Sequence, residues 1–153
     1  MTRQFIFFVC IAILNCALAK DGQAEVFGDY VGYATCQPCH GEIVESWKAT
    51  PHASAFADLK KQGDEKQSVP GCVRCHVVAM DKDGGFIDMD MTPELKDVQC
   101  EACHGPGKAH VASQKPSDIV GKPGEPLCRD CHTEGQDKNF DYTVKSKLVH
   151  SRQ

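Results

Sequence analysis

The sequence predicts a mainly α-helical fold with much irregular loop, in which short helices wrap around bound groups instead of a large apolar core. A segment of the form Cys-x-x-Cys-His occurs four times in the 153 residues, and apolar periodicity between these segments is weak. Thirteen glycines and eight prolines also interrupt the chain. A chain this small, with so few large aliphatic residues, is not expected to build an ordinary apolar core of its own.

The first 19 residues have the pattern of a cleaved secretory signal. Arg3 precedes an apolar stretch over residues 5–14, and the small-residue sequence Ala17-Leu18-Ala19 closes the segment. The apolar stretch is too short to span a bilayer comfortably, so we expect no integral membrane segment after cleavage. A signal peptide at 1–19 predicts a protein located in the periplasm or outside the cell.

The remaining residues, 20–153, are expected to form a single domain that carries all four Cys-x-x-Cys-His segments. A lipid anchor on Cys16 is the alternative to signal cleavage after Ala19. Asn15 occupies a position where such an anchor needs a small residue, which disfavours this alternative.

The clearest helical pattern lies between residues 41 and 61. Thr50 and Pro51 suit the cap and the first residue of a second helix within it. One face of that helix would carry His52, Ala55, Phe56 and Leu59. Residues 84–91, with the sequence GGFIDMDM, are ambiguous between a short strand and a loop.

All eight cysteines that follow the predicted signal belong to the repeated segments. The pairs are Cys36 with Cys39, Cys72 with Cys75, Cys100 with Cys103, and Cys128 with Cys131. The histidines that directly follow these pairs are His40, His76, His104 and His132. Nothing else between the segments repeats clearly, so the recurring unit is a chemical site.

This pattern is the attachment sequence of c-type haem. Two thiols one helical turn apart reach the two vinyl groups of one porphyrin, and the adjacent imidazole reaches the iron. Zinc sites and disulfides also use paired cysteines, but neither explains a histidine after every pair. The sequence therefore predicts four covalently bound haem c groups, which fill the interior and without which the chain stays unfolded.

Three histidines lie outside the attachment segments, namely His52, His110 and His150. Each is a candidate second axial ligand, because imidazoles on both faces of a haem give an iron suited to electron transfer. One of the four haems would then lack a second histidine. Its free face would be open, or would be closed by another subunit or by one of Met80, Met89 and Met91.

The stretch CEACHGPGKAH places His110 only six residues after His104. A link this short, beginning Gly-Pro-Gly, does not easily pass around the edge of a porphyrin. His110 is therefore predicted to reach a neighbouring haem and to bring two porphyrins close together.

Three segments resemble the tetraheme cytochromes c of the hydroxylamine-oxidising pathway, the cytochrome c-554 type. They read YATCQPCHGEIVESWKATPHASAF, GCVRCHVVAMDKDGGF and VQCEACHGPGKAH. The resemblance implies an irregular helical fold around stacked haems and electron transfer in the periplasm. It also implies that His52 binds the third haem, His110 the first and His150 the fourth, which leaves the second haem, on His76, with an open face.

The first hypothesis for function is an exported carrier of single electrons between redox protein partners, which is not an enzyme. The second is binding or reduction of nitric oxide or a related N-oxide at a five-coordinate second haem. The third is a subunit of an extracellular cytochrome filament, in which a neighbouring copy donates the fourth ligand. A formal net charge of −4 suits a cationic patch on a protein partner and lacks the basic stripe of a nucleic-acid binder.

Overall fold

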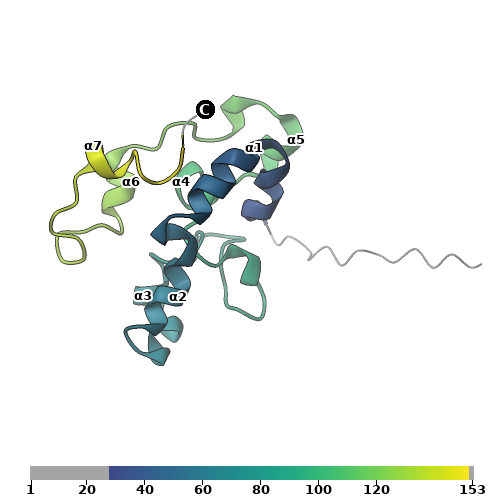
Figure 1. Cartoon of the computed structure of the whole chain (residues 1–153). Coiled ribbons are helices and arrows are strands. Elements are labelled where there is room, and N and C mark those ends of the chain that lie inside the picture. Colours follow the sequence, from purple (N-terminus) through teal and green to yellow (C-terminus); the bar gives the residue numbers. More distant parts are fainter. Residues whose placement is uncertain (1–27, 152–153) are drawn as a thin grey trace, which may run out of the picture.

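The computed structural model describes residues 28–151 and is mainly α-helical with long connecting loops, as predicted (Figure 1). The α-helices are α1 (Tyr33–Lys48), α2 (Ala55–Lys60), α3 (Pro70–Val73), α4 (Cys100–His104), α5 (Lys108–Ser113), α6 (Glu125–Arg129) and α7 (Tyr142–Lys145). The 3-10 helices are η1 (Pro51–Ser54), η2 (Asp64–Ser68), η3 (Pro93–Leu95) and η4 (Pro116–Asp118). The predicted signal peptide, residues 1–19, lies outside the described residues.

The longest helix, α1, carries the first attachment segment. It contains Pro38 and is kinked at His40, whose φ of −118° and ψ of 37° are not helical. Beyond the kink, the Trp47 side chain is buried and its Nε1 donates a 2.9 Å hydrogen bond to the Val98 carbonyl. This bond ties the C-terminal half of α1 to the segment that leads into α4.

The turn after α1 differs in one detail from the sequence prediction. Pro51 begins η1, as predicted, but the Thr50 side chain does not cap it. The Thr50 hydroxyl instead donates to the Trp47 carbonyl at 2.7 Å, and the Thr50 amide donates to the same carbonyl at 2.8 Å.

A small apolar core surrounds α2 and α3, although the sequence analysis expected none. It comprises Phe56, Leu59, Val73, Val77, Val78, Phe86 and Leu95. The loop after the second attachment segment folds back on itself, since the Val78 amide donates to Leu95 and the Phe86 amide to Val78, both at 2.9 Å. The core residues come one or two at a time from short, separate segments. The sequence therefore shows no apolar periodicity that would predict this core. In the described residues the only β pairing is an isolated bridge between Val77 and Lys96, so residues 84–91 form a loop.

Helices α6 and α7 lie together, apart from α2 and α3 (Figure 1). The Tyr142 hydroxyl donates to the Pro123 carbonyl at 2.9 Å, and Arg129 donates to the Phe140 carbonyl at 3.1 Å. Asp141 caps α7 by accepting from the amides of Thr143 and Val144. This unit carries the fourth attachment segment.

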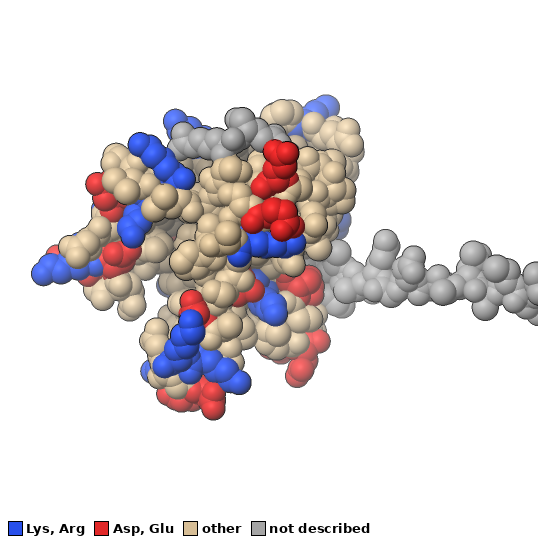
Figure 2. Space-filling model, viewed as in Figure 1, with Lys and Arg blue, Asp and Glu red and all other residues tan. Residues whose placement is uncertain are grey.

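Acidic and basic side chains are interspersed over the face seen in Figure 2. Several of them form exposed ion pairs within one helix, such as Lys48 with Glu45 at 2.8 Å. Between residues 28 and 151, no helix combines the length and the apolar character that crossing a membrane requires.

Candidate haem centres

Each attachment segment lies on a short helix or at its C-terminal end. The first is inside α1, the second begins in α3, the third is α4 itself, and the fourth begins in α6. Helical backbone places the two cysteines of each segment about one turn apart, as attachment to one porphyrin requires. The eight cysteines of residues 28–151 form no disulfides with one another.

Three pairs of histidine rings face one another at nearly the same distance. Ring centroids are 6.2 Å apart for His40 and His110, 6.0 Å for His52 and His132, and 6.1 Å for His104 and His150. Imidazole nitrogens bind transition metals at about 2 Å, so two imidazoles on opposite sides of one metal ion hold their centroids about 6 Å apart. The donor set therefore fits iron bound between the two rings of each pair.

Hydrogen bonds at the other ring nitrogen support this fit. The Nδ1 atoms that face a backbone carbonyl are those of His76 with Ala55, His104 with Val120, His110 with Lys115, and His150 with Ser151. A carbonyl oxygen only accepts, so Nδ1 carries the proton and Nε2 keeps a free lone pair. Histidines that bind metals are commonly oriented by such a bond.

The ring pairs show which histidine lies opposite each attachment histidine. His110 faces His40 and not His104, in line with the limited reach of the short link. The resemblance implied the third haem for His52 and the fourth for His150; in the structure, His52 faces His132 of the fourth segment and His150 faces His104 of the third. The order of segments along the chain does not fix which distant histidine reaches each one.

The C-terminal end of the described chain is tied down, which brings His150 to its partner. The Ser151 amide donates a 2.6 Å hydrogen bond to the Ser46 hydroxyl on α1. His150 is thus held beside α1, near the third attachment segment.

Within the described residues, no second histidine ring pairs with His76. Its Nδ1 is held by the Ala55 carbonyl. Among the methionines named above, Met80 packs against the small apolar core, whereas Met89 and Met91 are exposed. The second segment therefore differs from the other three, in agreement with the count of spare histidines.

Thiols of different segments lie close enough to influence one another. The Cys36 side chain neighbours that of Cys100. The Cys131 side chain likewise neighbours that of Cys75. These contacts join the first segment to the third and the second to the fourth.

A third proximity connects these two pairs of segments. The partly buried Cys103 side chain lies near that of Cys128. The four segments are therefore connected in the order first, third, fourth, second.

Glu101 is a buried residue for which the sequence analysis found no role. Its carboxylate accepts hydrogen bonds from the amides of Val31, Gly32 and Gly107 at 2.7 to 3.0 Å, and the residue is only 3% exposed. It thus fastens the start of α1 and the start of α5 to α4. A carboxylate inside an attachment segment, followed by two glycines, was the available signal.

A metal site built from protein side chains alone does not fit this arrangement. In residues 28–151, no group of three or more His, Cys, Asp and Glu side chains is disposed to hold a metal ion. Structural zinc needs four such ligands. Opposed imidazoles beside paired thiols match an iron whose other ligands come from a porphyrin.

This combination of fold and site defines a multihaem c-type cytochrome. Residues 35–105 match the family described as cytochrome c554 and c-prime. The chain is 32% identical to cytochrome c-554 of Nitrosomonas europaea over 140 residues, which cover 82% of this chain and 57% of that protein. The solved structure of the reduced state of cytochrome c554 from Nitrosomonas europaea matches with a TM-score of 0.59 and 26% identity, over 83% of this chain and 86% of that chain.

The chain is a tetraheme cytochrome c of the cytochrome c-554 type. It spans 57% of the length of the curated relative it matches. The predicted fold class and the four covalently bound haem c groups are confirmed.

Proposed function

We propose that the chain carries single electrons between redox protein partners through haems attached at Cys36 and Cys39, Cys72 and Cys75, Cys100 and Cys103, and Cys128 and Cys131. The iron of each haem is bound by the histidine that ends its segment, namely His40, His76, His104 or His132. His110, His52 and His150 close the first, fourth and third haems, and the second haem has one histidine.

The three histidine pairs are the observation that carries this proposal. Their centroid distances lie within 0.2 Å of one another, although the rings come from six separate places in the chain. Iron with imidazole on both faces changes oxidation state with little change in ligation, which suits electron transfer. The protein's part is to orient these rings and to hold the haems near one another.

The contacts between thiols support an electron route through all four haems. Cys36 lies against Cys100, Cys103 near Cys128, and Cys131 against Cys75. A route in the order first, third, fourth, second has the first haem at one end and the second at the other. Electrons would enter and leave through these two ends.

The proposed location is the periplasm or the cell exterior, with residues 1–19 removed as a signal peptide and residues 20–153 forming one domain. The order of Arg3, the apolar stretch and Ala17-Leu18-Ala19 supports export. A net charge of −4 suits a partner with a cationic patch.

The unpaired His76 favours a second candidate function, the binding of a small ligand such as nitric oxide at the second haem. An iron with one protein ligand leaves a face open, whereas a bis-histidine iron does not. The same feature also provides the test of the ligand assignment.

We expect carbon monoxide to bind one of the four haems of the reduced holoprotein. The measurement is the carbon monoxide difference spectrum, with the amplitude compared with total haem. A response from about one quarter of the haem agrees with three closed sites and one open site. A response from none of the haem contradicts the open second site, and a response from half or more contradicts the histidine pairs.

A further inference from the structure

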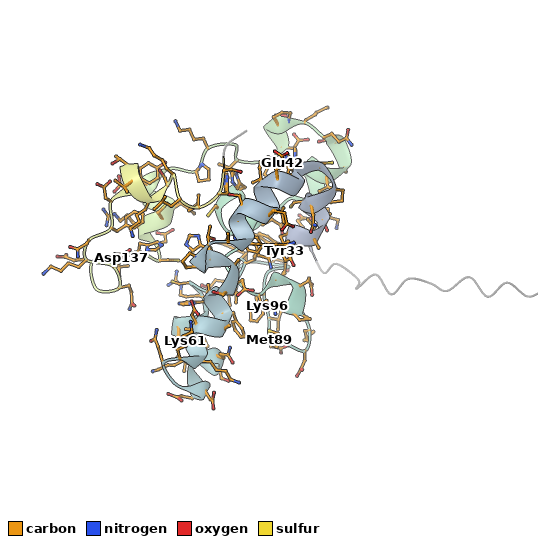
Figure 3. All side chains as sticks on the ribbon, viewed as in Figure 1. Tyr33, Glu42, Lys61, Met89, Lys96 and Asp137 are labelled. Atoms are coloured by element: carbon orange, nitrogen blue, oxygen red, sulfur yellow. The ribbon has the colours of Figure 1, made fainter. Side chains whose placement is uncertain are left out.

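The fourth site differs from the others in the group that holds its proximal histidine. His132 Nδ1 faces the Asp137 carboxylate at 3.0 Å, whereas His76 and His104 face the carbonyls of Ala55 and Val120. Asp137 lies on the loop between α6 and α7 (Figure 3). Among the histidines of residues 28–151, His132 alone has a carboxylate as the hydrogen-bond partner of its Nδ1.

The contact is partly shielded from water. The side chains of His132 and Asp137 are 35% and 31% exposed. The Phe140 ring stacks on the His132 ring with centroids 4.6 Å apart, and Arg129 covers the other side of Phe140 at 4.7 Å. The histidine ring therefore has a fixed orientation, with its Nδ1 directed at the carboxylate.

Among the described residues, the Asp137 carboxylate forms no ion pair with a lysine or an arginine. Arg129, which lies over the Phe140 ring, pairs with Glu125 at 3.1 Å. The Asp137 charge is therefore directed at the His132 imidazole.

We propose that Asp137 is a positioning residue that lowers the reduction potential of the haem bound by His132 below the value that a neutral carbonyl partner would give. A carboxylate that accepts the Nδ1–H bond gives the imidazole more anionic character and makes it a stronger donor to iron. Taking up one electron from a redox partner removes one positive charge from the iron, so a stronger donor and a nearby negative charge both favour the oxidised form. The proposal rests on the assignment of His132 and His52 to this haem.

The test is a spectroelectrochemical titration of the holoprotein with the substitution Asp137→Asn. Asparagine has nearly the same shape and can still accept the bond, but it has no charge. We expect one haem to become easier to reduce, by roughly a tenfold change in its ratio of reduced to oxidised form at a fixed potential, with the other three unchanged. Glu134→Gln is the matched control, because Glu134 is an exposed acid on the same loop and its loss changes the net charge equally.

A companion variant assigns the haem that responds. His52→Met changes a ligand of the same iron, so the low-spin signal that it alters by electron paramagnetic resonance should belong to the haem whose potential shifts in Asp137→Asn. Glu134→Gln should alter neither property. An unchanged potential in Asp137→Asn, with four haems and normal spectra retained, overturns the proposed role of Asp137.

The two proposals fail in different ways. If His52→Met leaves every haem signal unaltered, the ligand assignment itself is wrong, whatever Asp137→Asn does. If Asp137→Asn loses haem, the variant Asp137→Glu separates structure from charge, because it retains the carboxylate. Normal haem content with a wild-type potential in Asp137→Glu supports the charge, and a potential raised as in Asp137→Asn contradicts it.

Discussion

Replacing His110 with glycine should open a second haem of the reduced protein to carbon monoxide. His110 faces His40 across 6.2 Å, and its Nδ1 is held by the Lys115 carbonyl at 2.9 Å, so its Nε2 is directed at the first haem. Without the imidazole, the first haem keeps one protein ligand. We expect the responding fraction to rise from about one quarter to about one half of the haem, measured by the difference spectrum.

Val111→Ala provides the control for this substitution. Val111 follows His110 on α5, is 43% exposed, and faces no histidine ring in the described structure. Its loss should leave the responding fraction unchanged. If His110→Gly leaves the responding fraction at about one quarter, His110 does not close a haem and its assignment as a second ligand is wrong.

Replacing Glu101 with alanine should destabilise the holoprotein by about 4 kcal/mol, because three backbone amides lose a charged acceptor in a buried place. Within residues 28–151, the amides of Val31, Gly32 and Gly107 have no acceptor other than Glu101. Gly32 adopts a φ of 72°, so the start of α1 depends on an external partner to hold this shape. We expect the melting temperature, followed by circular dichroism, to fall by about 10 °C.

The close fit around Glu101 supplies a second variant. A methyl group on Gly107 would lie 3.0 Å from the Glu101 Oε1, so Gly107→Ala should also destabilise the protein, but less than Glu101→Ala. Glu42→Ala is the control, because Glu42 is an exposed acid on α1 (Figure 3). A melting temperature for Glu101→Ala within about 2 °C of that of Glu42→Ala would contradict the role of Glu101 as a clamp.

The attachment segments were predictable because five adjacent residues encode all the chemistry of each one. The second ligands were predictable in number, since seven histidines and four segments leave three. Their pairing was not, except for His110, where a short link limits the reach. His52 and His150 approach their partners through contacts between distant segments, such as the bond from Ser151 to Ser46, and the sequence does not display such contacts.

Two acidic residues, Glu101 and Asp137, illustrate the same limit. Glu101 is 70 residues from the Val31 amide that it holds, and Asp137 is brought to His132 by the loop between two short helices. The mainly helical fold with long loops was predictable from the weak apolar periodicity and from the many glycines and prolines that interrupt the chain. The small apolar core did not, because it collects single residues such as Phe56 and Leu95 from elements too short to show periodicity.

Counting the spin states of iron in the oxidised holoprotein tests the central claim most directly. Electron paramagnetic resonance with spin quantitation, on protein whose mass shows four attached haems, should give three low-spin bis-imidazole irons for each high-spin iron. Four low-spin irons would mean that the haem on His76 has a second strong ligand. Two or fewer would mean that at least one of the three histidine pairs does not enclose iron.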